Sequence, residues 1–459
     1  MNSRQDSNIF ENYYDVTKCD FGNPFEDIGA VINNIILDIK SKQKEKDNLM
    51  GGKPGGVIFI PSGDYHLKTQ VIIDISFLKI IGTGHGFTSS SIRFNTEQNE
   101  LKEWKELWPG GSRIIVDLNS DSEIKCAAFY IKREGSPRIS SVEFDGFNID
   151  GGHFVDDNLG KCIPENSYIN KKTGIYIDSA NDSFKICNMG FIYLEHGIIS
   201  HNTDAMNIHN NFIAECGNCI ELRGSGQASK VSNNLMGAGY KGYTVYAENF
   251  GGLLVSGNNI FPRGKSSIYF NNVAKSNVTS NRIHAFYPGV IIFKDSYDNL
   301  ISSNHILRDS EPWEPMKNVG SDVKDSFGLV RIEGSRNSII GNHISECMDL
   351  KSLNPKDRKP VIIDLFRGIK NYIAMNHIVA TIGSGESLDS DEDACFLAQV
   401  GAILSGGSCG ELEIIAVNIE KESEYNIVLD TGMDDEIIAD REKNYIRAIP
   451  GLLFQKMHE

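Results

Sequence analysis

The apolar positions of the chain follow two different periods. From Phe25 to about Lys46 they recur three or four residues apart, which is the period of an amphipathic helix. After the glycine-rich stretch GGKPGG (51–56), short alternating runs such as VIFIP, QVIID and LKIIGTG begin, and these are typical of β-strands separated by turns. The pattern therefore predicts one helix near the N-terminus followed by a long series of short strands.

The strand region carries a repeat of about 23 residues. After Gly174, an asparagine followed two residues later by an apolar residue recurs in NNF, NNL, NNI, NRI and three copies of NHI. Several short strands per repeat at this period predict a parallel β-helix, with the asparagines stacked as a ladder at one turn. The anchors taken for the ladder are Asn210, Asn233, Asn258, Asn281, Asn304, Asn342 and Asn376.

These patterns predict three regions: an N-terminal arm and capping helix (1–50), a parallel β-helix (51–400), and C-terminal coils with a cap (401–459). Residues 1–24 are polar and are expected to be irregular. Three segments, 88–112, 151–174 and 308–326, break the strand rhythm and are expected to be loops that leave the coil. For the first two, a binding role and a merely tolerated insertion are equally good interpretations.

Charge and composition narrow the class of partner. A formal net charge of -16 disfavours nucleic acid and anionic membranes, whereas a neutral, hydroxyl-rich substrate remains compatible. No apolar run approaches the roughly 18 residues that span a bilayer. The first 20 residues lack the apolar region of a signal peptide, and the nine cysteines do not form a disulfide framework, so we expect a cytoplasmic protein.

The stretch DAMNIHNNFIAECGNCIE (204–221) holds two isolated acids, Asp204 and Glu215. Residues one period apart lie roughly 4.8 Å apart on adjacent coils, so Asp204 should have Asp182 on the coil before it and Gln227 on the coil after it. Neighbouring carboxylates raise each other's pKa, which is the setting that a general acid requires. Composition alone favours the alternative that these acids are solvated on an exposed face.

The same spacing gives Glu215 a column of neighbours: Tyr193, Ala238, Arg263 and Phe286. Arg263, Gln227 and Asp182 are therefore candidate substrate-binding residues. Trp104 or Trp108, in the segment 88–112, is the candidate aromatic for stacking on a sugar.

The two acids are 11 residues apart, which is about half of one coil, and should lie on different faces. Glycosidase carboxyls, by contrast, lie roughly 5 to 10 Å apart. Either the intervening strand leaves the coil, or each site pairs one acid with residues of a neighbouring subunit. We favour the second explanation, which predicts a closed oligomer.

Two further motifs are better explained by packing than by chemistry. Cys216 and Cys219 lack the second Cys or His pair that a zinc site needs, so two small buried residues are expected. His305, His343 and His377 share the NHI position and should stack, most simply as surface residues. No metal or cofactor is expected.

The segments DAMNIHNNFIAECGNCIELRGSGQA, GGKPGGVIFIPSGDY, LKIIGTGHGF and AFYPG resemble the inulin fructotransferase and difructose dianhydride III (DFA III) hydrolase family. The resemblance covers most of the chain and is weakest after about Ile344 and in 308–326. It implies an all-β, right-handed, single-stranded parallel β-helix that assembles as a homotrimer with active sites at subunit contacts. It also implies that Asp204 and Glu215 are the catalytic acids and that no metal or cofactor takes part.

Within this family we expect a hydrolase that opens DFA III to inulobiose, with Glu215 as general acid and Asp204 as base or stabiliser; the reverse assignment stays open. The alternative is a fructotransferase that releases DFA III from inulin, a large extracellular polymer that a cytoplasmic enzyme would not meet. A non-catalytic carbohydrate-binding β-helix is the hypothesis from another class. A polysaccharide lyase of the same fold would need calcium-binding Asp clusters, and none is evident.

Overall fold

The computed structural model describes residues 12–43, 55–86, 110–134, 137–152, 170–179, 182–238, 242–261, 266–285, 289–308, 329–349, 361–383, 415–429 and 437–447. The chain forms two compact units, residues 1–216 and 217–459, which are taken in turn below. Their boundary falls inside the repeat, and the expected regions 1–50, 51–400 and 401–459 stay a prediction. Most of the three expected loops lies outside the described residues, although Ser112 and Thr173 each begin a strand.

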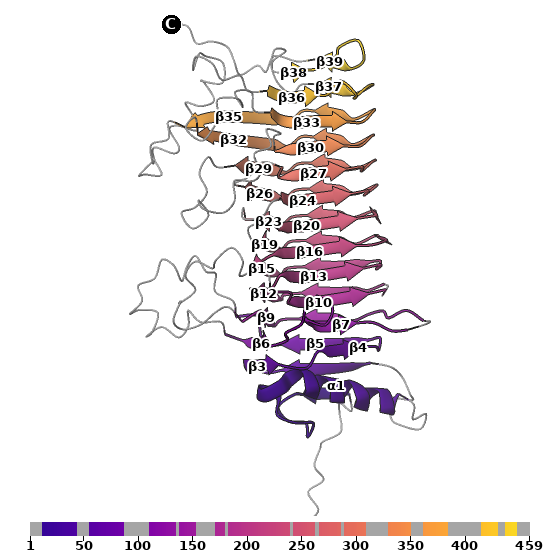
Figure 1. The fold of residues 1–459 in the computed structure, drawn as a ribbon, viewed down its shortest axis with the longest axis vertical. Coiled ribbons are helices and arrows are strands. Elements are labelled where there is room, and N and C mark those ends of the chain that lie inside the picture. The colour runs from indigo at the N-terminus through magenta and orange to yellow at the C-terminus, as the bar shows by residue number, and fades with distance from the viewer. Residues whose placement is uncertain are drawn as a thin grey trace, which may run out of the picture. The chain divides into compact units, whose positions relative to one another are not determined.

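The predicted helix is α1 (Pro24–Lys42), and it packs against the first strands of the coil, β2 (Gly56–Ile60), β3 (Gly63–Leu67) and β4 (Val71–Ile73) (Figure 1). The helix begins at Pro24 because the Asn23 side chain accepts a hydrogen bond from the backbone N–H of Phe25. Its apolar stripe is buried, as the helical spacing predicts: Ile28, Val31, Ile32, Ile35, Ile36 and Ile39. The prediction of an N-terminal capping helix is confirmed.

The strands of the first unit form three parallel sheets, visited in the same order on each coil (Figure 1). The first sheet contains β1 (Tyr13–Asp15), β2, β5 (Leu78–Gly82), β8 (Glu143–Asp145), β11 (Phe184–Cys187) and β14 (Met206–His209). The second contains β3, β6 (Ser112–Val116), β9 (Asn148–Asp150), β12 (Gly190–Ile192) and β15 (Phe212–Cys216). The third contains β4, β7 (Ala127–Ile131), β10 (Thr173–Asp178) and β13 (His196–His201). Strand β1 corrects the expectation that residues 1–24 are irregular, since it pairs in parallel with β2.

The second unit repeats this arrangement. Its first sheet contains β18 (Lys230–Ser232), β22 (Leu254–Ser256), β25 (Asn277–Thr279), β28 (Leu300–Ser302), β31 (Ser338–Ile340), β34 (Tyr372–Ala374), β37 (Ile427–Leu429) and β39 (Tyr445–Arg447). Its second contains β19 (Leu235–Ala238), β23 (Asn259–Ile260), β26 (Arg282–Ala285), β29 (His305–Arg308), β32 (His343–Asp349) and β35 (His377–Gly383). Its third contains β16 (Asn218–Arg223), β20 (Tyr243–Glu248), β24 (Ser266–Asn271), β27 (Ile291–Lys294), β30 (Val330–Glu333), β33 (Val361–Arg367), β36 (Ile415–Ile419) and β38 (Ile437–Ile438). A small fourth sheet pairs β17 (Gly226–Gln227) with β21 (Phe250–Gly251).

Each coil contributes inward-facing apolar side chains that stack on those of the next coil. In the second unit, the central residue of each of seven first-sheet strands is almost wholly buried: Val231, Val255, Val278, Ile301, Ile339, Ile373 and Val428. β-branched residues suit this place because their stiff side chains pack well on a pleated surface. The expected all-β, right-handed parallel β-helix with an N-terminal helix is confirmed. Among the described residues, no helix is both long and apolar enough to cross a bilayer.

A buried asparagine ladder follows the turn between the first and second sheets. In the second unit, Asn304 donates through Nδ2 to Asn342 Oδ1 (3.0 Å) and accepts from Asn281 Nδ2 (2.9 Å). The same bond links every successive pair of the ladder, which consists of Asn234, Asn258, Asn281, Asn304, Asn342 and Asn376. In the first unit Asn211 takes this role, because its Oδ1 accepts from the backbone N–H of Met189.

The ladder corrects two of the expected anchors. In NNF and NNL the second asparagine is the buried one, whereas Asn210 and Asn233 are exposed residues with a φ of 56°. Asparagine tolerates this left-handed conformation better than most residues. The column of residues above and below Glu215 must therefore be counted from Asn211, not from Asn210.

A second asparagine ladder follows the turn between the third and first sheets, and the sequence repeat did not reveal it. Its members are joined by Nδ2–Oδ1 hydrogen bonds of 2.9–3.2 Å: Asn299, Asn337, Asn371, Asn426 and Asn444. Their separations of 38, 34, 55 and 18 residues hide the period. The ladder side chains also pair with backbone groups at the turns, where strand pairing ends: Asn371 Oδ1 accepts from the Asn337 N–H, and Asn337 Nδ2 donates to the Ser296 carbonyl.

Candidate active site

The structure places Asp204 and Glu215 on different parts of one coil. Asp204 lies in the turn between β13 of the third sheet and β14 of the first sheet, and its side chain is 29% exposed. Glu215 lies near the end of β15 in the second sheet and is only 5% exposed. The two acids thus belong to different faces, as the coil spacing predicted.

The backbone at Glu215 departs from strand geometry. Its φ is 55°, and Tyr193 one coil earlier has a φ of 58°. The Tyr193 N–H donates to the Glu215 carbonyl at 3.0 Å, so the predicted stacking of these two residues is confirmed. Strict alternation would put Glu215 on the inward side with Ile213, and the left-handed residue interrupts that alternation. Many turn residues of the described chain share this conformation, Tyr193 among them, so it ends the strand alternation at Glu215 and does not by itself mark function.

Arg138 is a neighbour of Asp204 that the sequence did not reveal. Its guanidinium donates to the carbonyls of Ser179 (3.0 Å) and Asn202 (2.7 Å), which lie in turns of two successive coils. The Arg138 Nη1 atom also lies 3.7 Å from Asp204 Oδ2. Arg138 therefore ties the turn that carries Asp204 to the preceding turn and places a positive charge beside the carboxylate. It escaped notice because it precedes the recognisable repeat and is 66 residues away from Asp204.

The candidate substrate-binding residues are only partly covered by the described chain. Asp182 is exposed and lies one coil before Asp204, since Phe184 pairs with Met206, so its predicted place is confirmed. Gln227 is exposed in β17 of the second unit. Whether either residue contacts substrate stays a prediction. Trp104, Trp108 and Arg263 lie outside the described residues.

The corrected ladder removes the reason for choosing Arg263. Glu215 lies four residues after Asn211, and the equivalent residue after Asn258 is Pro262, one position before Arg263. Further along the second unit, the same position holds Arg308 and Glu346, whose Nε and Oε1 atoms lie 2.6 Å apart. Burial raises the pKa of the Glu346 carboxyl to about 7, against the opposing effect of Arg308.

The two cysteines behave as packing residues, whereas the three histidines lie at the surface as predicted, His305 and His377 exposed and His343 partly exposed. Cys216 and Cys219 are both fully buried and neither is in a disulfide, and burial raises the pKa of Cys216 to about 12. The predicted packing role is confirmed for both. His305, His343 and His377 do stack, with ring centroids 4.9 and 4.8 Å apart. In the described part of the chain, no group of three or more His, Cys, Asp or Glu side chains is arranged to hold a metal ion.

Comparisons with known proteins identify the family. The sequence pattern described as the beta helix repeat of inulin fructotransferase matches residues 303–450, and that of NosD, a periplasmic copper-binding protein, matches residues 138–324. The chain is 40% identical to the DFA-I-forming inulin fructotransferase of Arthrobacter globiformis over 388 residues, which is 83% of this chain and 92% of the relative.

Solved structures of the DFA-IIIase from Arthrobacter chlorophenolicus A6 are also similar. One is 54% identical with a TM-score of 0.85, and its complex with DFA-III is 53% identical with a TM-score of 0.84. Each comparison covers 96% of this chain and 99% of the solved one. These relatives are enzymes that act on inulin and related fructans. The expected resemblance is confirmed: the chain belongs to the family of parallel β-helix proteins that comprises the inulin fructotransferases and the DFA-IIIases.

Proposed function

We propose that this protein is a DFA III hydrolase that opens the cyclic difructose to inulobiose. The observation that carries the proposal is that the chain has a higher sequence identity to the DFA-IIIase than to the fructotransferase. Identity to the DFA-IIIase is 51–54% in nearly full-length comparisons, whereas identity to the DFA-I-forming fructotransferase is 40%. The cysteines of the described chain are not in disulfides, which suits a reducing compartment. We therefore place the enzyme in the cytoplasm, acting on a small imported substrate.

Glu215 and Asp204 are the proposed catalytic pair. Glu215 gives its proton to the leaving oxygen as the bond between that oxygen and the anomeric carbon breaks. Asp204 takes a proton from the attacking water, whose oxygen bonds to the same carbon, and it stabilises the oxocarbenium-like state. We give the acid's role to Glu215 because this residue, at 5% exposure, is more shielded from water than the side chain of Asp204, at 29%. No cofactor enters this scheme.

The position of the two acids on different faces of one coil supports a site shared between subunits. We propose a homotrimer in which Asp204 of one protomer and Glu215 of a neighbour act on one substrate. Light scattering coupled to size-exclusion chromatography gives the assembly state, and diluted or mutationally separated monomer is then assayed. We expect the monomer to be inactive; full activity in a stable monomer would refute the shared site.

The direction of the reaction is tested by product analysis. Purified protein is incubated separately with DFA III and with inulin, and the products are separated by chromatography. We expect rapid formation of inulobiose from DFA III and little release of any dianhydride from inulin. Rapid release of a dianhydride from inulin would establish the alternative, an inulin fructotransferase.

Arg138 offers a separate prediction about the positioning of Asp204. In Arg138→Ala both turn carbonyls lose the hydrogen bond from Arg138, so the turn is held less firmly, and we expect kcat to fall about 10- to 100-fold with a smaller change in KM. Arg138→Lys keeps the charge but cannot span both carbonyls, and an intermediate kcat is expected. Steady-state kinetics on DFA III measures kcat and KM separately for each variant. A kcat in Arg138→Ala equal to that of the wild type would show that the turn holds Asp204 without this side chain.

A further inference from the structure

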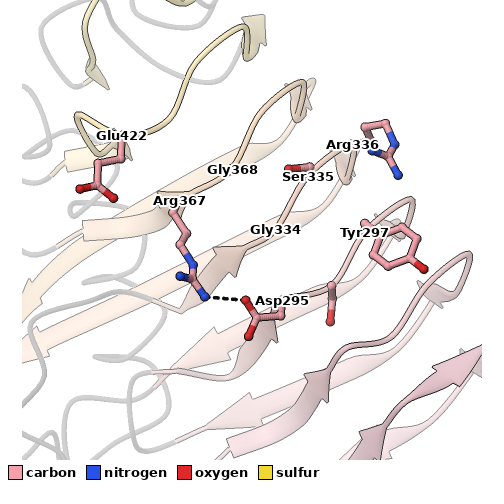
Figure 2. A pocket seen from close by; sticks show the side chains of 9 residues that line it. Asp295, Tyr297, Gly334, Ser335, Arg336, Arg367, Gly368 and Glu422 are labelled. Carbon is pink, nitrogen blue, oxygen red and sulfur yellow. Dashed lines mark hydrogen bonds and ion pairs between the residues drawn. The ribbon is translucent and has the colours of Figure 1, made fainter. Parts of the chain in front are cut away.

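A pocket of about 530 Å³ lies on the second unit, within the roughly 300–1,000 Å³ typical of small-molecule sites. It is formed by successive turns that lead from the third sheet to the first sheet, after β27, β30, β33 and β36 (Figure 2). Its principal side chains are Asp295, Tyr297, Arg336, Arg367 and Glu422. None of these residues belongs to the proposed catalytic machinery.

The pocket begins at the coil where the residues stacked at one turn position change from Asn and Asp to glycine. On two earlier coils this column holds Asn249 and Asn272, which are hydrogen-bonded to each other at 2.7 Å, and then Asp295. On the next two coils the same position is Gly334 and then Gly368. A Cβ atom on Gly334 would lie 1.8 Å from the Ser296 carbonyl oxygen, so only glycine permits these turns to approach so closely. The floor of the pocket is consequently backbone.

An exposed aromatic ring stands at one side of this floor. Tyr297 is 39% exposed, and its column neighbours are small, Ala274 before it and Ser335 after it. The Arg336 guanidinium lies 5.5 Å from the centroid of the Tyr297 ring. Figure 2 shows Tyr297 and Arg336 close together on one side and Arg367 facing Asp295 on the other, with Glu422 beyond Arg367. Aromatic faces beside polar groups are suited to the apolar faces of sugar rings.

The charges of the pocket exclude a simple anion site. The Arg367 Nη2 atom lies 2.5 Å from Asp295 Oδ1 and 3.9 Å from Glu333 Oε2. Arg336 is bound through two nitrogens to Asp298, at 2.6 and 3.0 Å, and these bonds lower the pKa of the Asp298 carboxyl. Both guanidiniums therefore already face carboxylates, and Glu422 adds another negative group to the lining. A phosphate or carboxylate ligand would meet as much negative as positive charge.

A neutral polyhydroxylated ligand fits this lining better, because hydroxyl groups both donate to carboxylates and accept from guanidiniums. The turns rise along the coil at about 4.8 Å each, so three of them offer roughly 10 Å of linear polar surface. We propose that this pocket is a second carbohydrate-binding site, which holds a short, neutral oligosaccharide along the coil axis. The identification of the sugar as an oligofructose rests on the proposed function. The existence of a carbohydrate site in this pocket does not depend on it.

Hydrogen–deuterium exchange of the full-length protein tests the proposal with an inulin-derived fructose trimer as the probe. We expect slower amide exchange in 295–298, 334–337 and 367–370 when the trimer is present. In Tyr297→Ala the concentration needed for this protection should rise about five- to tenfold, whereas Tyr297→Phe, which keeps the ring, should resemble the wild type. Hydrolysis of DFA III should be unchanged in both variants.

The controls separate this site from the proposed active site. Protection of 204–215 reports on the proposed active site, so its loss alone would count against the proposed function and leave the pocket standing. Maltotriose tests other neutral sugars, and protection of the pocket by it supports a carbohydrate site that is not selective for fructose. Protection by inorganic phosphate in place of the oligosaccharide, or no protection of the three turns by any sugar, would overturn the proposal.

Discussion

Replacing Glu215 with glutamine is expected to lower kcat on DFA III by about 10²–10⁴-fold while the protein stays folded. The amide keeps the size of the side chain and its capacity for hydrogen bonding, but it cannot transfer the proton to the leaving oxygen. Asp204→Asn should cause a loss of similar size, because the attacking water then lacks its base. Inulobiose release gives kcat, and thermal melting followed by circular dichroism confirms the fold.

Glu346→Gln is the matched control for this experiment. Glu346 is as buried as Glu215, at 1% exposure, and occupies the equivalent position of a later coil. If removal of any buried carboxyl damages the coil, both variants should lose activity together. We expect Glu346→Gln to retain most of the wild-type kcat. A Glu215→Gln variant that keeps more than about a tenth of wild-type activity would contradict the assignment of Glu215 as general acid.

Asn304→Ala is expected to destabilise the protein by about 3 kcal/mol through loss of one step of the ladder. Asn304 Oδ1 accepts from the backbone N–H and the Nδ2 of Asn281, and Asn304 Nδ2 donates to Val278 O and Asn342 Oδ1. Alanine removes all four bonds and leaves their partners buried, where unsatisfied polar groups are costly. Chemical denaturation monitored by circular dichroism measures the change.

Asn277→Ala provides the comparison on a neighbouring coil. Asn277 is an exposed residue at the start of β25, so its replacement should change stability by less than about 0.5 kcal/mol. Equal destabilisation by the two substitutions would mean that the ladder bonds contribute no more than surface asparagines do.

The fold was largely predictable because it is periodic. The same apolar pattern recurs about every 23 residues, so each coil repeats the evidence of the others. The helix α1 was predicted from its own apolar spacing of three or four residues. Errors arose where the pattern was locally ambiguous. The pairs Asn210–Asn211 and Asn233–Asn234 each offer two anchors, and only burial shows that the second is in the ladder.

The site was less predictable because its contacts link residues far apart in the chain. The isolated acids Asp204 and Glu215 were proposed from their surroundings and from the family resemblance, and their catalytic role stays a prediction, whereas the spacing correctly put them on different faces. Arg138 was missed because no repeat connects it to Asp204. Arg263 was chosen through an anchor that was out of register by one residue, an error that no count along the sequence can detect by itself.

The ladder geometry has a consequence for how such chains diversify. Asn281 and Asn304 are 23 residues apart and Asn304 and Asn342 are 38 apart, yet their side-chain hydrogen bonds measure 2.9 and 3.0 Å. Fifteen additional residues therefore leave the step of the coil unchanged, and lengthening a loop costs little conformational free energy. We therefore expect loops inserted between ladder asparagines to be exchangeable with those of relatives without loss of the fold. Chimaeras cut next to these asparagines, compared by thermal melting with the parent chain, test that expectation.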